Sequence, residues 1–188
     1  MIYKYLLWLS ITVPLFTDTE SGQKTANEDK VHWSADRKLS WQDFKGRPKE
    51  DSRYSAESSL QISYGLKISN QSGVTEYSFT VDCYFEKNDS WVKTDKKTDD
   101  LLKHEQLHFD IAEYFSRKLR REFKNNSFTI QDYQSKSTAI FNKNFTEYQS
   151  YQTAYDEETR HGSIAEEQVR WNERIKNLLV KSKAYKKM

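Results

Sequence analysis

Two histidines and a glutamate lie together in the segment His104-Glu-Gln-Leu-His108, where the histidines are four residues apart. On a helix, residues four apart lie one turn above each other, so both imidazoles can reach one metal ion. Glu105 lies about 100° round the same helix, close enough to accept a proton from a water on that metal. The H-E-x-x-H spacing is typical of zinc hydrolases. The sequence therefore predicts one zinc ion on His104 and His108, with Glu105 as general base.

The residues around the motif have the pattern of an amphipathic helix. A stripe at steps of three and four contains Leu101, His104, His108, Ile111, Phe115 and Leu119. Such a stripe is expected to face the core. Thr98 is placed to cap the helix, and Asp99 and Asp100 follow where the helix dipole favours negative charge. We expect a helix from about residue 98 to about residue 123, with both histidines on its buried face.

The third ligand has to come from elsewhere, because a catalytic zinc usually has three protein ligands and one open position. The stretch Tyr155-Asp-Glu-Glu-Thr-Arg-His-Gly162 lies about fifty residues downstream, at a predicted helix junction. Gly162 would let the backbone approach the site closely. We predict His161 as the third ligand, with a helix C-cap as its alternative role. Asp156 is expected to orient a ligand imidazole, or to coordinate the metal itself.

Two further side chains near these candidates bear on the prediction. Tyr155 or Tyr151 is expected to donate a hydrogen bond to the oxyanion that forms when a carbonyl is attacked. Glu113 lies about 140° from His108 on the motif helix, so we expect it to face outward and to take no part in the site.

The composition indicates one domain without a polyanionic partner. The chain has 188 residues, of which 36% are hydrophobic and 14% aromatic, which is enough for one core. A net charge of +2 from 30 basic and 28 acidic residues predicts no nucleic-acid binding. Cys83 is the only cysteine, so no internal disulfide is possible, and its alternating strand pattern predicts a core residue.

The N-terminus has the features of an export signal. Lys4 precedes an uncharged, mostly apolar run of 12 residues from Tyr5 to Phe16. This run is shorter than the about 20 residues that span a bilayer. We predict a signal peptide or N-terminal anchor over residues 1–21, a flexible spacer over 22–36 and a single domain over 37–188. The expected location is secreted or periplasmic, and an uncleaved anchor would give transient membrane association.

The order of the hydrophobic patterns predicts an α+β fold. Alternation over residues 60–68 and 77–85, with a turn over 70–73, predicts a β-hairpin, and a short strand follows at residues 91–92. Helical periodicity then predicts a second helix from about residue 129 and a third after Ile164. We expect a small antiparallel sheet from the N-terminal half, packed with about three long helices.

Three separated segments carry a family resemblance: Leu39–Pro48, Leu101–Glu113 and Tyr155–Gly162, the last followed by Gln168 and Trp171. In them the chain resembles the bacterial DUF922 family, whose members are described as predicted secreted zinc-dependent proteases. The resemblance implies an exported H-E-x-x-H peptidase with a zincin-like active-site helix, acting on a peptide or protein substrate.

Two other interpretations remain open. The chain could be a non-catalytic zinc-binding module that binds partners at the cell surface or in the periplasm. Glu105 argues against this interpretation, because a structural site needs no general base and usually closes the fourth position. The chain could also be a metal-free domain in which His104 and His108 are buried and satisfied by hydrogen bonds.

Overall fold

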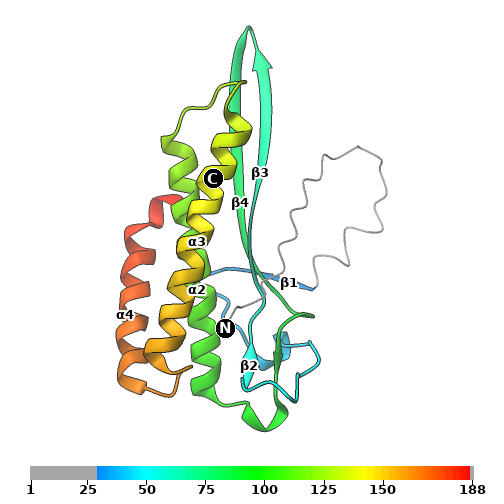
Figure 1. The fold of residues 1–188 in the computed structure, drawn as a ribbon, viewed down its shortest axis with the longest axis vertical. Helices are drawn as coiled ribbons and strands as arrows, with labels where there is room; N and C mark the ends of the chain where they lie inside the picture. Colours follow the sequence, from blue (N-terminus) through cyan, green and yellow to red (C-terminus); the bar gives the residue numbers. More distant parts are fainter. Residues whose placement is uncertain (1–28, 187–188) are drawn as a thin grey trace.

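The computed structural model describes residues 29–186, in which a small antiparallel sheet precedes three long helices (Figure 1). The strands are β1 (Lys30–His32), β2 (Ala56–Glu57), β3 (Leu60–Gln71), β4 (Val74–Glu86) and β5 (Trp91–Val92). The helices are α2 (Asp99–Asn125), α3 (Tyr133–Thr159) and α4 (Ala165–Lys181), and the short 3-10 helices are η1 (Trp41–Asp43), η2 (Thr94–Lys96) and η3 (Lys183–Tyr185). The predicted α+β fold is confirmed.

The hairpin of β3 and β4 is the longest part of the sheet. Its strands pair antiparallel from Leu60–Phe85 to Gln71–Val74. Ser72 and Gly73 form the turn in left-handed conformations, with φ of 51° and 80°, which suits the twist of a two-residue hairpin. The tip extends beyond the helices (Figure 1). β1 pairs with the other edge of β4, and β2 and β5 form a separate two-stranded sheet.

The predicted spacer is wrong in its last part. Residues 30–32 form β1, with Val31 buried opposite Phe85, and the indole Nε1 of Trp33 donates to Asp110 Oδ1 at 2.7 Å. A three-residue strand in a polar stretch gives no periodic signal. The predicted signal or anchor and the first part of the spacer lie outside the described residues. Among residues 29–186, no helix is long and apolar enough to cross a membrane.

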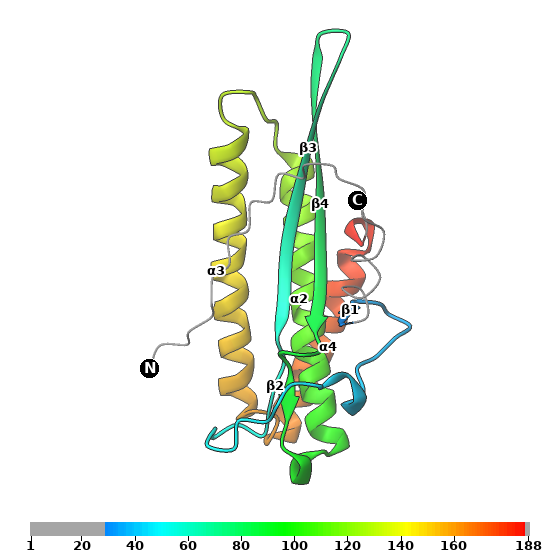
Figure 2. The ribbon, with the colours of Figure 1, turned by 90° about the vertical axis from the view of Figure 1, so that its right-hand side faces the viewer.

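Helix α2 lies behind the hairpin in Figure 2, with α3 on one side and α4 on the other, and it contacts all of them. Its predicted N-cap is confirmed, because Thr98 Oγ1 accepts a hydrogen bond from the Leu101 amide at 3.2 Å. The predicted stripe faces the core, and His104, Ile111, Phe115 and Leu119 are all buried. Helix α2 therefore holds the motif histidines against neighbours on several sides.

The expectation that Glu113 faces outward is wrong. Its side chain is buried and accepts from Arg117 Nε at 2.8 Å and from Arg120 Nη1 at 3.3 Å. Arg120 also donates to the Val81 carbonyl of β4 at 2.7 Å. A helix covered on one side has a polar outer face, but α2 is covered by the sheet, α3 and α4. Its second half therefore encloses charged groups, in which one carboxylate pairs with two guanidinium groups.

Replacing Glu113 with alanine should destabilise the fold by about 3–5 kcal/mol, because two buried guanidinium groups would lose their only carboxylate partner within this cluster. Urea denaturation of the purified variant measures this loss. Glu122→Ala is the control, since Glu122 lies on the same helix with a half-exposed side chain and should change stability by less than about 0.5 kcal/mol. Equal effects of the two substitutions would contradict the buried network.

Candidate metal centre

Three donor atoms from two helices meet beside the first half of α2. The Nε2 atoms of His104 and His108 lie 3.1 Å apart. Asp156 Oδ1, from the end of α3, lies 3.1 Å from the first and 3.0 Å from the second. A tetrahedral site with ligand distances of about 2.0–2.1 Å has about 3.3 Å between ligand atoms. The three atoms therefore have nearly the spacing of one face of a zinc site, and they form a group suited to hold a metal ion.

Two glutamines determine which imidazole nitrogens face this group. Gln152 Oε1 lies 2.6 Å from His108 Nδ1, and Gln168 Oε1 lies 3.2 Å from His104 Nδ1. The amide nitrogen of Gln152 donates to the His108 carbonyl at 3.0 Å, and that of Gln168 donates to Asn172 at 3.1 Å. Each glutamine oxygen is therefore turned towards its imidazole. Both histidines donate from Nδ1, which leaves their Nε2 lone pairs directed at Asp156.

A convergence of two nitrogen lone pairs and a carboxylate oxygen requires a cation among them. In the metal-free chain that cation is a proton. Burial alone would lower the pKa of His108, but the charge and hydrogen bond of Asp156, with the charge of Glu105, raise it to about 9. Burial would raise the pKa of Asp156, but the charge of His108 and the hydrogen bonds of both imidazoles hold it well below its usual range. A proton shared by these atoms would balance their charge, and the same three atoms could hold a metal ion in its place.

The ring of Tyr155 packs against both imidazoles. Its buried ring stacks on His104, with centroids 4.6 Å apart, and meets the ring of His108 edge-on at 4.7 Å. Its hydroxyl donates to Gln168 Oε1 at 2.9 Å and lies 3.2 Å from the His104 carbonyl oxygen. These bonds occupy the hydroxyl that we expected at the oxyanion, so the geometry favours a supporting role. The alternative, Tyr151, packs edge-on against Trp171 at 4.9 Å.

Gly162 makes the close approach that its position in the sequence predicted. It has a left-handed φ of 79°, and a Cβ there would lie 3.1 Å from both Cβ and Cγ of His104. A side chain at this position would be strained and would press on a motif histidine. The turn after α3 therefore packs closely against the side chain of His104.

The structure separates the two candidates for the third ligand. Asp156 belongs to the three-residue group, and His161 does not. The imidazole of His161 is half-exposed, and its Nδ1 lies 3.2 Å from Asp156 Oδ1. Its ring meets that of Tyr54 edge-on at 5.1 Å. The geometry thus favours Asp156 over the predicted His161 and places His161 beside the carboxylate.

Glu105 is buried next to the histidines and is held by a residue that the sequence did not indicate. Ser58, directly after β2, donates from Oγ to Glu105 Oε2 at 2.6 Å. A single serine in a loop carries no pattern that would identify it. Gln152 was also missed, although it lies four residues before Asp156 and thus on the same face of α3. Helical spacing from Asp156 would have found it.

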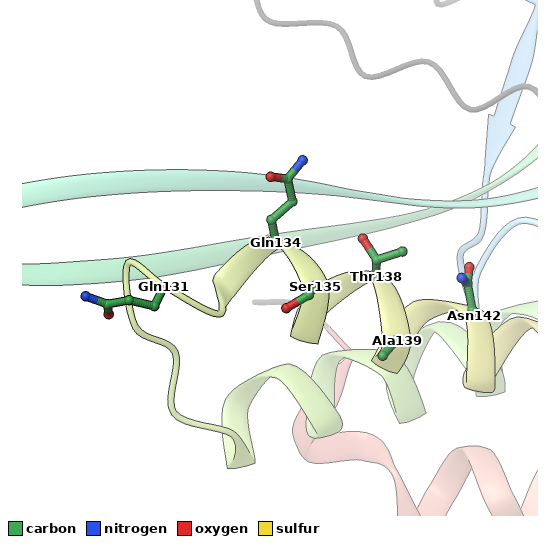
Figure 3. A pocket seen from close by; sticks show the side chains of 6 residues that line it. All are labelled: Gln131, Gln134, Ser135, Thr138, Ala139 and Asn142. Carbon is green, nitrogen blue, oxygen red and sulfur yellow. The ribbon is translucent and has the colours of Figure 1, made fainter.

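A surface depression of about 580 Å³ lies elsewhere, at the start of α3 (Figure 3). It is lined by Gln131, Gln134, Ser135, Thr138, Ala139 and Asn142. None of these side chains ionises or binds metals well, and the depression lies about 30 Å along α3 from Asp156 at the helical rise. The residues suited to chemistry are those of the metal centre.

Comparison with known proteins places the chain in a family. A family model described as a bacterial protein of unknown function, DUF922, matches residues 19–162, and the chain therefore belongs to the DUF922 family. The matched segment contains both motif histidines, Glu105, Asp156 and His161, and it ends at Gly162. No match was found among curated proteins or among solved structures. The family assigns no activity, so a function has to be argued from the site.

Gly162→Ala should weaken zinc binding and lower stability by about 1–2 kcal/mol, because the new methyl group is strained at positive φ and presses on His104. Gly73→Ala is the matched control, since Gly73 has a similar φ of 80° in the hairpin turn but no neighbour within 4 Å. Both variants should lose stability in thermal denaturation. Only Gly162→Ala should lose zinc affinity in a chelator competition, and an equal loss in both would show that the contact is unimportant.

The metal-free chain should become less stable as the pH rises from 7 to 9.5. The folded pKa of His108 is about 9 against a model value of 6.5, so its contribution is fully present below about 6.5 and is lost as the pH passes about 9. Thermal denaturation across this range, with a chelator present, measures the trend. His108→Ala should flatten it. A parent chain whose melting temperature rises over the same interval would contradict the raised pKa.

Proposed function

We propose that this protein is a zinc-dependent peptidase in which His104, His108 and Asp156 hold one zinc ion and Glu105 is the general base. One observation carries the proposal. Two imidazole Nε2 atoms and one carboxylate oxygen converge within 3.1 Å of one another, and a buried glutamate follows the first histidine on the same helix. Metal-activated water and an adjacent base are the two parts that hydrolysis of an amide bond requires.

The ligand set favours a catalytic metal over a structural one. Two histidines and one carboxylate leave a fourth position of a tetrahedral zinc open, whereas structural sites usually fill all four positions with cysteine and histidine. The side-chain exposure rises from 3% at His104 to 13% at His108 and 27% at Asp156. The group is thus closed towards the core and open towards solvent on the Asp156 side, where a substrate would enter.

The same set of two histidines and one carboxylate also binds iron(II) in oxygenases. The H-E-x-x-H spacing favours zinc, because oxygenases need no glutamate between their histidines. Metal analysis distinguishes the two.

Zinc in this site would lower the pKa of a bound water towards about 7 and polarise the carbonyl that is attacked. Glu105 accepts the water proton and delivers it to the leaving amine. Ser58 holds the Oε2 atom of this carboxylate, which leaves Oε1 for the proton. Gln152 and Gln168 hold the imidazoles in the tautomer that coordination requires.

The peptide or protein substrate and the export of the chain follow from the family resemblance and remain part of this proposal. A zinc-binding module without activity is the alternative. It requires the same metal but gives no role to Glu105, and this difference makes the two experimentally distinct.

Residues 22–188, purified without a histidine tag, should contain about one zinc per chain by elemental analysis. His104→Ala and Asp156→Ala should lose the metal, whereas Glu105→Gln should retain it. Hydrolysis of a quenched fluorescent peptide library should fall about 10²–10⁴-fold in Glu105→Gln, because the general base is removed. Zinc binding in the parent without any hydrolysis would favour the non-catalytic zinc-binding module. Iron in place of zinc would favour an iron(II) site of the oxygenase kind.

A further inference from the structure

The turn between α3 and α4 has a backbone conformation that residues with a side chain rarely adopt. Arg160, His161 and Gly162 have consecutive left-handed φ angles of 47°, 53° and 79°. Helices often end in one left-handed residue, which is usually glycine or asparagine. Here two residues with a Cβ atom precede the glycine, and both are strained. An observed strain of this kind is a reason to ask what the strained residues do.

The backbone of the turn does not explain why His161 is there. Its amide donates to the Asp156 carbonyl at 2.9 Å, and the Ile164 amide donates to the Thr159 carbonyl at 2.9 Å. Any residue at position 161 would make the same backbone bond, and glycine would make it without strain. The reason for a histidine must lie in its imidazole.

The imidazole meets the metal-binding carboxylate from outside the donor group. His161 Nδ1 lies 3.2 Å from Asp156 Oδ1, the same oxygen that faces His104 and His108. Tyr54 contacts the ring of His161 edge-on and restricts its rotation. Asp156 is partly exposed at the surface end of α3, where a carboxylate would otherwise be free to turn towards solvent.

We propose that His161 is a positioning residue for Asp156. In the proposed site its Nδ1–H would donate to Oδ1, which lies 3.2 Å away, and would hold this atom in the orientation that completes the metal-binding group; this contact would be the reason for the strained turn. The inference rests on the proposed function, because the group that His161 orients is the proposed metal site. Hydrogen bonds to a metal-binding side chain typically change metal affinity about 10–100-fold, which sets the size of the expected effect.

The neighbouring strained residue provides a matched control. His161→Gly and Arg160→Gly relieve the same kind of backbone strain at adjacent positions, but only the first removes the imidazole. Zinc affinity is measured by competition with a chromophoric chelator. His161→Gly should bind zinc about 10–100-fold more weakly than the parent, and Arg160→Gly should bind it equally well.

Melting temperatures of the metal-free chains separate positioning from a structural role. Arg160→Gly should melt about 1–3 °C higher than the parent, because a left-handed residue without a Cβ is unstrained. His161→Gly should melt no lower than the parent, despite its weaker zinc binding. A large fall in its melting temperature would mean that the turn needs His161 in order to fold, and the proposal would be wrong.

Asparagine offers a rescue that tests the hydrogen bond itself. It tolerates the left-handed conformation, and its amide nitrogen occupies the place of the imidazole Nδ1. His161→Asn should therefore recover most of the affinity that His161→Gly loses. The visible absorption of the cobalt-substituted chain should keep its shape in both variants, because the number of ligands stays the same.

Three results would overturn the proposal in different ways. Equal zinc affinity in His161→Gly and Arg160→Gly would show that the imidazole does not position Asp156. Loss of zinc beyond about 10³-fold, with a changed cobalt spectrum, would show that His161 is itself a ligand. A parent chain that binds no zinc would refute the proposed function, and the inference with it. The parent's own affinity distinguishes this last case from the first two.

Discussion

The structure depends on one electrostatic constraint, which is that three hydrogen-bond acceptors share a space of about the size of one ion. His104, His108 and Asp156 bring two Nε2 atoms and one Oδ1 atom within 3.1 Å of each other. Such a group is stable only with a cation, so its residues are paired as firmly as a salt bridge although they lie up to 52 positions apart. This pairing joins the start of α2 to the end of α3, and the neighbouring side chains are arranged around it.

Several surrounding elements contact this group or the neighbouring Glu105. Helix α3 provides Gln152 and the stacked ring of Tyr155, α4 provides Gln168, and the segment between β2 and β3 provides Ser58 for the glutamate. The turn before α4 brings Gly162 against His104. A site built from four separate elements is rigid only when all of them pack, which explains why the central helix is covered on nearly every side. The buried charges of its second half are a consequence of the same coverage.

The sequence predicted the features that depend on local periodicity. The hairpin, the three long helices, the cap at Thr98 and the buried position of His104 all follow from spacings of two, three or four residues. It failed where tertiary packing decides. Strand β1 is too short for a period, and Glu113 was placed outside because a helical wheel assumes one covered face. The sequence also did not show which of Asp156 and His161 lies closest to the two histidines. That placement depends on two left-handed residues, and no side-chain pattern indicates a left-handed conformation at arginine or histidine.

Side-chain exposure increases from His104 through His108 to Asp156. Solvent therefore reaches the group from one side, and a metal ion could reach it by the same route. His104 is enclosed by Tyr155 and Gly162, whereas Asp156 lies at the surface end of α3 and His161 lies outside it. In the proposed site a metal ion would therefore enter from the Asp156 side and, like a proton, would neutralise the carboxylate beside the imidazoles. Because both cations use the same lone pairs, metal binding must release the proton of His108. A closed structural site would bury all of its donors equally, whereas this group has its most exposed donor at Asp156, which fits the hydrolytic site that we propose.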